Sequence, residues 1–334
     1  MSFLPVRASK RLALSTTTPS RPWICTSCRR TLTTTSRSLQ QQQQSTPNKP
    51  TDRPTQAPKP EDETTHFGYT TLPSALKASR VASVFSSVAS SYDTMNDLMS
   101  LGIHRLWKDH FVRSLNPGVS HASEKNHPGQ KILDIAGGTG DIAQRMLDHA
   151  TQINNDDLTS VIVSDINPQM LTEGKKRLSQ TPYAVANRLE FLEANAEDLH
   201  TIPDASIDLY TVAFGIRNFT HKQKALDEAF RVLKPGGVFA CLEFCPNLHN
   251  PLLNGVYKRW SFGAIPLIGQ VVASDRESYR YLVESIERFP TQEAFKEMIR
   301  EAGFVIPGEG RGGKGWEDLS FGVAAVHKGV KPVR

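Results

Sequence analysis

Between residues 131 and 244, short and almost continuously apolar runs alternate with stretches whose apolar residues recur every three or four positions. Runs of about four to eight apolar residues are typical of strands buried on both faces, and the longer spacing is typical of the helices that cover them. The pattern therefore predicts an α/β fold with a parallel sheet between two layers of helices. The predicted strands are 131–136, 160–165, 188–194, 208–214 and 237–244, and the predicted helices are 141–150, 168–180 and 222–233.

The segments on either side of this region predict the remaining elements. Residues 66–130 look mostly helical, and we expect them to cover an edge of the sheet or its ligand-binding face. Periodic apolar residues predict two helices at 278–289 and 292–304 and a last strand at 321–328. The segment 308–320 reads as a flexible glycine-rich loop. The sequence contains no internal repeat.

The first fifty residues differ from the rest in composition. From Met1 to Thr51 there is no Asp or Glu but there are eight Lys or Arg, together with many Ser and Thr and a glutamine run at 40–44. An acid-free head rich in Arg and Ser is typical of an organelle transit peptide, most simply a mitochondrial one. We therefore predict a transit peptide and disordered head at 1–50 and a linker at 51–65, followed by the cap (66–130) and the sheet domain (131–330).

Charge and cysteine content exclude several functions. Without the head, the chain has 31 Lys and Arg against 34 Asp and Glu, so we do not expect its body to bind nucleic acid. Cys25 and Cys28 form a lone C-x-x-C without the second pair that a zinc site needs, and we expect no metal site. Cys241 and Cys245 are interpreted as small core residues. No apolar run approaches the ~18 residues of a membrane span.

The strongest chemical signal is the turn LDIAGGTGD at 133–141, which follows the first strand. Glycines at this place let the backbone approach a ligand, and the helix that follows presents free N–H groups. A dinucleotide site needs G-x-G-x-x-G, whose third glycine is missing here, so an NAD-dependent oxidoreductase is only an alternative. The spacing D-x-A-x-G-x-G is similar instead to the first motif of class I S-adenosylmethionine-dependent methyltransferases, with Ala136 in place of the first glycine.

Polar residues also end the next three strands. Asp165 closes the second strand, Asn195 and Ala196 follow the third, and Arg217 and Asn218 follow the fourth. In an open parallel sheet these positions meet at the carboxyl edge, where ligands bind. The methyltransferase resemblance implies that Asp165 accepts both ribose hydroxyls and that Asn195 and Ala196 contact the adenine. The cofactor site implied in this way comprises Gly138, Thr139, Gly140, Asp165, Asn195 and Ala196.

Longer stretches narrow the resemblance to one family. YDTMNDLMSLGIHRLWK at 92–108 and RVLKPGGVFACLE at 231–243 are similar to the two signatures of the ubiquinone/menaquinone biosynthesis C-methyltransferases of the UbiE type. Shorter stretches resemble the same family in the same order, namely THFGY, VFSSVASSYD, AGGTGD, FGIRN and SYRYLVESI. The resemblance covers residues 64–330, and the transit-like head points to its mitochondrial members. It departs at Ala213, where bacterial relatives often have a serine.

The resemblance implies a fold, a reaction and a location. The fold is a doubly wound, mostly parallel seven-stranded sheet with an N-terminal helical cap. The reaction transfers a methyl group from S-adenosylmethionine to a ring carbon of a 2-methoxy-6-polyprenyl-1,4-benzoquinol in ubiquinone synthesis. The resemblance also implies peripheral contact with the matrix side of the mitochondrial inner membrane and membership of a multi-subunit ubiquinone-synthesis complex, and it allows a homodimer. The apolar segment 251–272 suits a substrate lid, an interfacial patch, a partner surface or ordinary cover of the sheet.

A quinol carbon becomes nucleophilic when a neighbouring hydroxyl group loses its proton, so the enzyme must position the ring and stabilise a phenolate. We predict that Arg217 stabilises the phenolate, that Asn218 donates to a quinol or methoxy oxygen, and that Tyr92 completes the network. Asp93 and His104 are candidates for the general base. The competing interpretation is a catalytically silent subunit that uses the methyltransferase fold as a scaffold.

Overall fold

The structure is a computed structural model, and it describes residues 63–88, 97, 100, 102–118, 128–248, 250–273, 276–309 and 312–333. The predicted transit peptide (1–50) and all but the last three residues of the predicted linker (51–65) lie outside these ranges. So do Cys25 and Cys28. The description below concerns the described residues from Glu63 onward.

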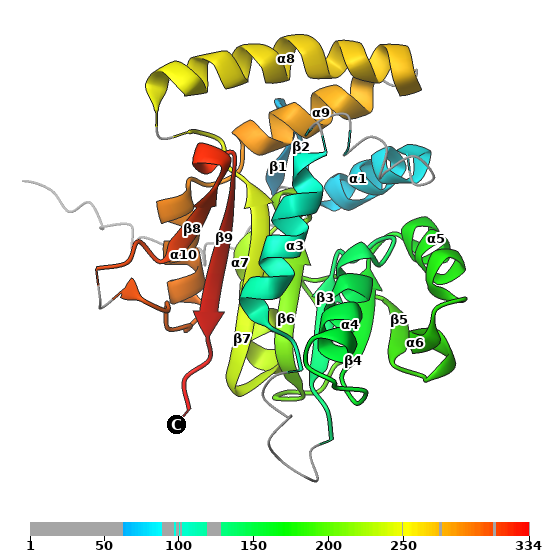
Figure 1. Cartoon of the computed structure of the whole chain (residues 1–334). Helices are drawn as coiled ribbons and strands as arrows, with labels where there is room; N and C mark the ends of the chain where they lie inside the picture. Colours follow the sequence, from blue (N-terminus) through cyan, green and yellow to red (C-terminus); the bar gives the residue numbers. More distant parts are fainter. Residues whose placement is uncertain are drawn as a thin grey trace, which may run out of the picture. The chain divides into compact units, whose positions relative to one another are not determined.

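Seven strands form one sheet in the order β5-β4-β3-β6-β7-β9-β8 (Figure 1). Five of them run parallel, namely β3 (Lys131–Ile135), β4 (Ser160–Asp165), β5 (Leu189–Glu193), β6 (Ile207–Ala213) and β7 (Leu233–Phe244). The sheet closes with two antiparallel strands, β9 (Ala324–Val330) beside β7 and β8 (Trp316–Leu319) at the edge. The predicted seven-stranded, mostly parallel sheet is therefore confirmed.

Helices cover both faces of the sheet, as predicted. One face packs against α3 (Ile103–Leu115), α4 (Asp141–Gln152) and α5 (Pro168–Leu178), and the other packs against α7 (Lys222–Val232) and α10 (Gln292–Glu301). The short helix α6 (Pro182–Val185) precedes β5. In Figure 1, α8 (Pro251–Ala273) lies over α9 (Arg276–Glu287), with which it makes most of its contacts.

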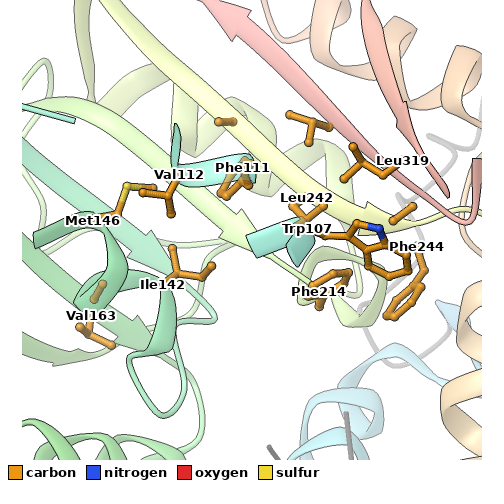
Figure 2. Packing of buried hydrophobic residues seen from close by; sticks show 14 of the residues in the cluster. Trp107, Phe111, Val112, Ile142, Met146, Val163, Phe214, Leu242, Phe244 and Leu319 are labelled. Carbon is orange, nitrogen blue, oxygen red and sulfur yellow. The ribbon is translucent and has the colours of Figure 1, made fainter. Parts of the chain in front are cut away.

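Side chains along the central strands point alternately to the two faces of the sheet, and this explains why the protein has two hydrophobic cores. In β6, Leu209 joins the core beneath α3 and α4, whereas the next residue, Tyr210, joins the core beneath α7 and α10. Successive side chains of a strand point to opposite faces, so a strand covered on both faces must be apolar at nearly every position. Figure 2 shows the first core, with Trp107 of α3 beside the rings of Phe214 and Phe244. Cys241 and Cys245 are buried and free, which confirms their interpretation as core residues.

The region before the sheet differs from its predicted form. It begins with an antiparallel hairpin, β1 (Thr64–Phe67) and β2 (Thr70–Pro73), before the expected helices α1 (Ser74–Val88) and α3. The hairpin strands are short and polar, so they carry no apolar run that could be recognised. Their pairing is supported by tertiary contacts, because Phe67 stacks on Tyr281 of α9 with ring centroids 4.1 Å apart.

The predicted flexible loop at 308–320 is wrong for its last third. Residues Trp316–Leu319 form the edge strand β8, which pairs with β9 although its sequence, WEDL, lacks an apolar pattern. Trp316 packs against Lys296, whose Nζ lies 5.5 Å from the centre of the indole ring. Among the described residues, no helix is long and apolar enough to cross a membrane.

The second core offers a direct test of this packing. Phe295 of α10 is fully buried, and its ring lies 5.1 Å from the rings of both Phe289 and His327. We expect Phe295→Ala to lower the free energy of unfolding by about 3–5 kcal/mol, because it removes buried apolar surface and leaves a cavity. Urea denaturation measures the change. The matched control is Val185→Ala, at a side chain that is 80% exposed, and it should stay within about 0.5 kcal/mol of the parent. Equal effects of the two variants would contradict the assigned core.

Candidate active site

A cavity of about 480 Å³ opens at the carboxyl ends of β3, β4, β5 and β6, with α1 forming its opposite wall. The structure brings most of the predicted site residues together here. Those that line the cavity are Gly138, Thr139, Asp165, Asn195, Ala196 and Asn218. On the α1 side the wall is apolar apart from Ser74 at the start of the helix, and it is formed by Ala75, Ala78, Val81, Ala82 and Phe85. One wall therefore offers polar groups and the other an apolar surface.

The glycine turn follows β3 closely because two of its residues adopt left-handed backbone conformations. Ala136 has φ 52° and Gly138 also has φ 52°. A Cβ atom on Gly138 would lie 2.9 Å from Cε of Met170 and would also project near the carboxylate of Asp165, so only glycine leaves this backbone accessible to a ligand. Gly140 does not line the cavity. It begins α4 with φ 75°, and a Cβ there would lie 2.5 Å from Cδ1 of Leu178, so its absence of a side chain serves packing.

Asp165 lies at the end of β4, where the sequence places it, and its side chain holds the glycine turn by hydrogen bonding. Its Oδ2 accepts a hydrogen bond from the backbone N–H of Gly138 at 3.0 Å, and its Oδ1 accepts one from the N–H of Asn167 at 2.9 Å. Burial raises the pKa of this carboxyl to about 6 in spite of these bonds. Each carboxylate oxygen keeps a second lone pair, so Asp165 can still accept from a ligand hydroxyl.

Asn167 connects this edge of the sheet to α1. Its side-chain oxygen caps α5 by accepting from the N–H groups of Gln169 and Met170, and Pro168 occupies the first helical position. Its Nδ2 donates to the backbone oxygen of Ala82 at 3.1 Å. The bond to α1 was not predicted, because nothing in the sequence shows which helix lies opposite.

Asp134, one residue before the end of β3, is a site residue that the predictions did not include. Its Oδ1 accepts from the hydroxyl of Thr211 at 2.8 Å, whereas its Oδ2 is buried without a hydrogen-bond partner among the described residues. Burial raises the pKa of this carboxyl to about 7. A buried oxygen without a donor costs free energy, and this one belongs to a cavity-lining residue, so it is satisfied if a ligand brings a donor. The sequence did contain a signal for this residue, because Asp134 is the acid that begins the motif D-x-A-x-G-x-G.

A buried ion pair forms the wall at the start of α4. Nζ of Lys108 in α3 lies 2.9 Å from Oδ2 of Asp141, and both residues line the cavity. This lysine, with Arg145 and Arg177, holds the pKa of Asp141 well below its usual range against the opposing effect of burial. Lys108 thereby brings a positive charge close to the glycine turn from the other side of the cavity.

Glu197 closes the end of the cavity near Asn195. Its carboxylate accepts from the backbone N–H groups of Thr220 and His221 at 2.7 and 2.9 Å, and it lies 2.8 Å from Nδ1 of the His221 ring. Asn195 orients this glutamate by accepting its backbone N–H at 3.0 Å. The turn after β5 is thus fixed to the segment after β6, an arrangement that the sequence spacing did not reveal.

Arg217 lies outside the cavity, which corrects the prediction that it faces the reacting ring. Its Nη1 lies 2.9 Å from Oε1 of Glu243 and also donates to the backbone oxygen of Phe214, while Nε donates to the hydroxyl of Ser285 at 3.3 Å. Both side chains of the ion pair are almost completely buried. The guanidinium therefore holds Phe214, which lines the cavity with a left-handed φ of 56°.

The other predicted catalytic residues have different placements. Asn218 lines the cavity, and its side-chain oxygen accepts from the hydroxyl of Tyr281 at 2.9 Å. Tyr92 and Asp93 lie outside the described residues. His104 is buried in α3, away from the cavity lining, with Nδ1 2.8 Å from the hydroxyl of Ser100, and burial lowers its pKa to about 4.

Comparison with known proteins agrees with this geometry. A model of the ubiE/COQ5 methyltransferase family matches residues 74–331, which is well over half of the chain. The chain belongs to the ubiE/COQ5 methyltransferase family. The match begins at the first residue of α1 and runs past the last strand, so it includes every element that lines the cavity apart from Glu63.

Individual relatives are similar over most of their length. The chain is 56% identical over 267 residues to the mitochondrial 2-methoxy-6-polyprenyl-1,4-benzoquinol methylase of Schizosaccharomyces pombe, with 80% of this chain and 84% of the relative covered. It is 48% identical over 270 residues to the ubiquinone/menaquinone biosynthesis C-methyltransferase UbiE of Cereibacter sphaeroides, covering 80% and 97%. The solved structure of the [4+2]-cyclase SpnF has a TM-score of 0.50 at 16% identity, covering 77% and 97%, and shows the fold alone.

The residues of the cavity fit S-adenosylmethionine, the methyl donor implied for this family. Asp134 offers an orphaned carboxylate oxygen to an ammonium group, and Lys108, whose charge is paired with Asp141, keeps further N–H donors for a carboxylate. Asp165 can accept from ribose hydroxyls, and the exposed backbone at Gly138 allows close approach. The three polar functions of the ligand thus have complementary groups on three different elements.

We expect affinity for S-adenosylhomocysteine, which keeps the ammonium group, to rise with pH up to about 7 and then to level off. Asp134 is largely protonated below its pKa of about 7, and the ammonium group binds the ionised form, so binding must release a proton at lower pH. Calorimetric titration on both sides of pH 7 measures this dependence. In Asp134→Asn the affinity should be weaker and the dependence shallower, with the part due to Asp165 remaining. An unchanged pH profile in this variant would contradict the role of Asp134.

A second prediction concerns Arg217. Arg217→Met leaves Glu243 charged and buried, so we expect a loss of about 3–5 kcal/mol in the free energy of unfolding. Adding Glu243→Gln removes the orphaned charge, keeps an acceptor for the neighbouring backbone N–H groups, and should recover about half of the loss or more. Urea denaturation measures both variants. If Arg217→Met kept its stability but lost turnover, the arginine would act on the substrate instead of on the fold.

Proposed function

We propose that the protein is a mitochondrial S-adenosylmethionine-dependent C-methyltransferase that methylates the ring of a 2-methoxy-6-polyprenyl-1,4-benzoquinol at the 3-position in ubiquinone synthesis. The observation that carries this proposal is the cavity itself, which joins a polar wall suited to the methyl donor to an apolar wall on α1. The names of the fungal and bacterial relatives support the substrate class, and the mitochondrial relative supports the location. S-adenosylmethionine, when bound, supplies the methyl group to the ring carbon.

The residues of the chain contribute positioning and electrostatic stabilisation. Asn218 follows β6 and lines the cavity, and its oxygen is already used by Tyr281, so its amide N–H groups are the donors for a quinol or methoxy oxygen. A donor held in this way costs little reorganisation when charge develops on the oxygen. The apolar residues of α1 and Phe214 keep water away from the ring, which strengthens that interaction.

Arg217 supports this arrangement from behind the cavity in our proposal. It holds the strained backbone of Phe214 and lies next to Asn218 in the chain, so it fixes two residues of the lining at once. Its charge is offset by Glu243 at 2.9 Å, which reduces its field in the cavity. Tyr92, predicted to complete the network, remains part of the proposal as a residue of the cap.

The polyprenyl tail needs a route to an apolar phase. We propose that α8 provides the peripheral contact with the matrix side of the inner membrane, because large apolar side chains are exposed along it. Leu252 is 77% exposed, Val256 62% and Leu267 63%. Exposed apolar residues on one helix favour burial at a lipid surface or against a protein. Another subunit of a ubiquinone-synthesis complex, or a second copy of this chain in a homodimer, would also cover the exposed apolar side chains of α8.

One experiment separates the candidate functions. We expect the purified protein, given methyl-labelled S-adenosylmethionine and a short-chain demethylated quinol, to place the label on the ring. Binding of S-adenosylhomocysteine without ring labelling would favour a silent scaffold, and preferential binding of NADH would favour an oxidoreductase.

Variants of Asn218 locate the chemistry within the cavity. Asn218→Ala should lower turnover by about 100-fold, the cost of losing one preorganised donor, while affinity for S-adenosylhomocysteine changes by less than about threefold. Tyr281→Phe is the matched control, because it removes the same hydrogen bond from Asn218 but keeps the amide donor. Similar losses of turnover in both variants would mean that Asn218 acts only through its bond to Tyr281.

A further inference from the structure

A second, smaller cavity of about 180 Å³ shares Thr220 with the main cavity and is lined by several cationic groups. Lys77 comes from α1, Arg217 and Lys222 come from the chain after β6, and Arg288 follows α9. No carboxylate is among the described residues that line it. The charge of Arg217 is balanced by Glu243, whereas Lys77, Lys222 and Arg288 form no ion pair within the described part of the chain.

The two lysines share one acceptor. Nζ of Lys77 and Nζ of Lys222 each donate to the backbone oxygen of Phe219, both at 3.1 Å. Lys77 is 95% buried, with a relative exposure of 5%. Within the described part of the chain, neither ammonium has a carboxylate oxygen within the 4.0 Å of an ion pair. The nearby Glu197 is already engaged by Thr220 and His221.

Buried ammonium groups without a counter-charge are unfavourable, because they lose their hydration and gain no ion pair. The pKa values of both lysines reflect this cost. Burial lowers the pKa of Lys77, and burial together with the proximity of Lys77 lowers the pKa of Lys222 to about 8. Each ammonium has three donors and uses one of them on Phe219. The cavity therefore offers several unused donors on two lysines whose charge Glu197 and Glu243 offset only in part and without an ion pair.

We propose that this second cavity binds a phosphate group. A phosphate dianion has the charge that the two lysines lack and enough acceptor oxygens to meet Lys77, Lys222 and the guanidinium of Arg288 at the mouth together. The hydroxyl-bearing Thr220, which lines both cavities, adds a neutral donor. The site is distinct from the methyl-donor cavity, since it contains neither the glycine turn nor Asp165. The inference does not rest on the proposed methyltransferase reaction.

The source of the phosphate group is either free phosphate or the headgroup of a phospholipid. The first arm of the experiment measures the thermal midpoint of the full chain against inorganic phosphate, at ionic strength held constant with chloride and with the first cavity saturated by S-adenosylhomocysteine. The second arm measures capture by phosphatidylcholine vesicles with and without phosphatidic acid. Phosphate also stabilises proteins by exclusion from their surface, so the signal is the difference between variants.

We expect Lys77→Met to weaken phosphate binding by about tenfold or more, which corresponds to losing one charge-assisted hydrogen bond. Lys222→Gln, at a half-buried position, should do the same and serves if Lys77→Met folds poorly. The matched control is Lys176→Met, at an exposed lysine of α5, which should respond like the parent protein. Binding in the vesicle arm alone, lost in the same two variants, would identify a lipid headgroup. If phosphate and phosphatidic acid act equally on the parent and on both variants, the proposal is wrong.

Discussion

The carboxylate of Asp165 is the interaction on which the site depends, because its two oxygens hold two separate segments of backbone. One oxygen accepts from Gly138 in the glycine turn and the other from Asn167 at the start of α5. Asn167 in turn holds α1 through the backbone oxygen of Ala82. The polar and apolar walls of the main cavity therefore share one support. A ligand that donates to Asp165 joins this network, so its binding and the positions of both walls are coupled.

Buried charge is treated in two ways around the cavities. Lys108 with Asp141, and Arg217 with Glu243, are close pairs at 2.9 Å in which each charge offsets the desolvation of the other. Such pairs fix the segments that carry them, here α3 to the start of α4 and the turn after β6 to β7. Lys77 and Lys222 share only a carbonyl oxygen between them. Among the described residues, these two lysines form no ion pair, and for this reason we propose an anion beside them.

The sequence allowed most of the sheet to be predicted, because each parallel strand is an apolar run between turn residues. The strand at 160–165 agrees with β4 residue for residue, and Asp165, Asn195 and Ala196 could be expected in one place because the ends of parallel strands meet. The hairpin β1–β2 and the edge strand β8 could not be predicted, since their short polar sequences depend on pairing with distant segments. The sequence also did not show that the side chain of Arg217 lies outside the main cavity. This placement depends on Glu243, which is distant in sequence and reads there as one polar residue in an apolar strand.

The segment after β6 contributes residues to both cavities. Asn218 and Phe219 line the main cavity, whereas the carbonyl oxygen of Phe219 accepts from the two lysines of the second. On its far side the segment is held by Glu197. An anion bound by the unused N–H groups of Lys77 and Lys222 would draw on the same two ammonium groups that hold this carbonyl, so its binding would act on one of the two anchors. Methyl transfer depends on placing the ring carbon in line with its donor. If Asn218 holds the ring as we propose, a small shift of Asn218 would change turnover while the polar groups on β3 and β4 keep their positions.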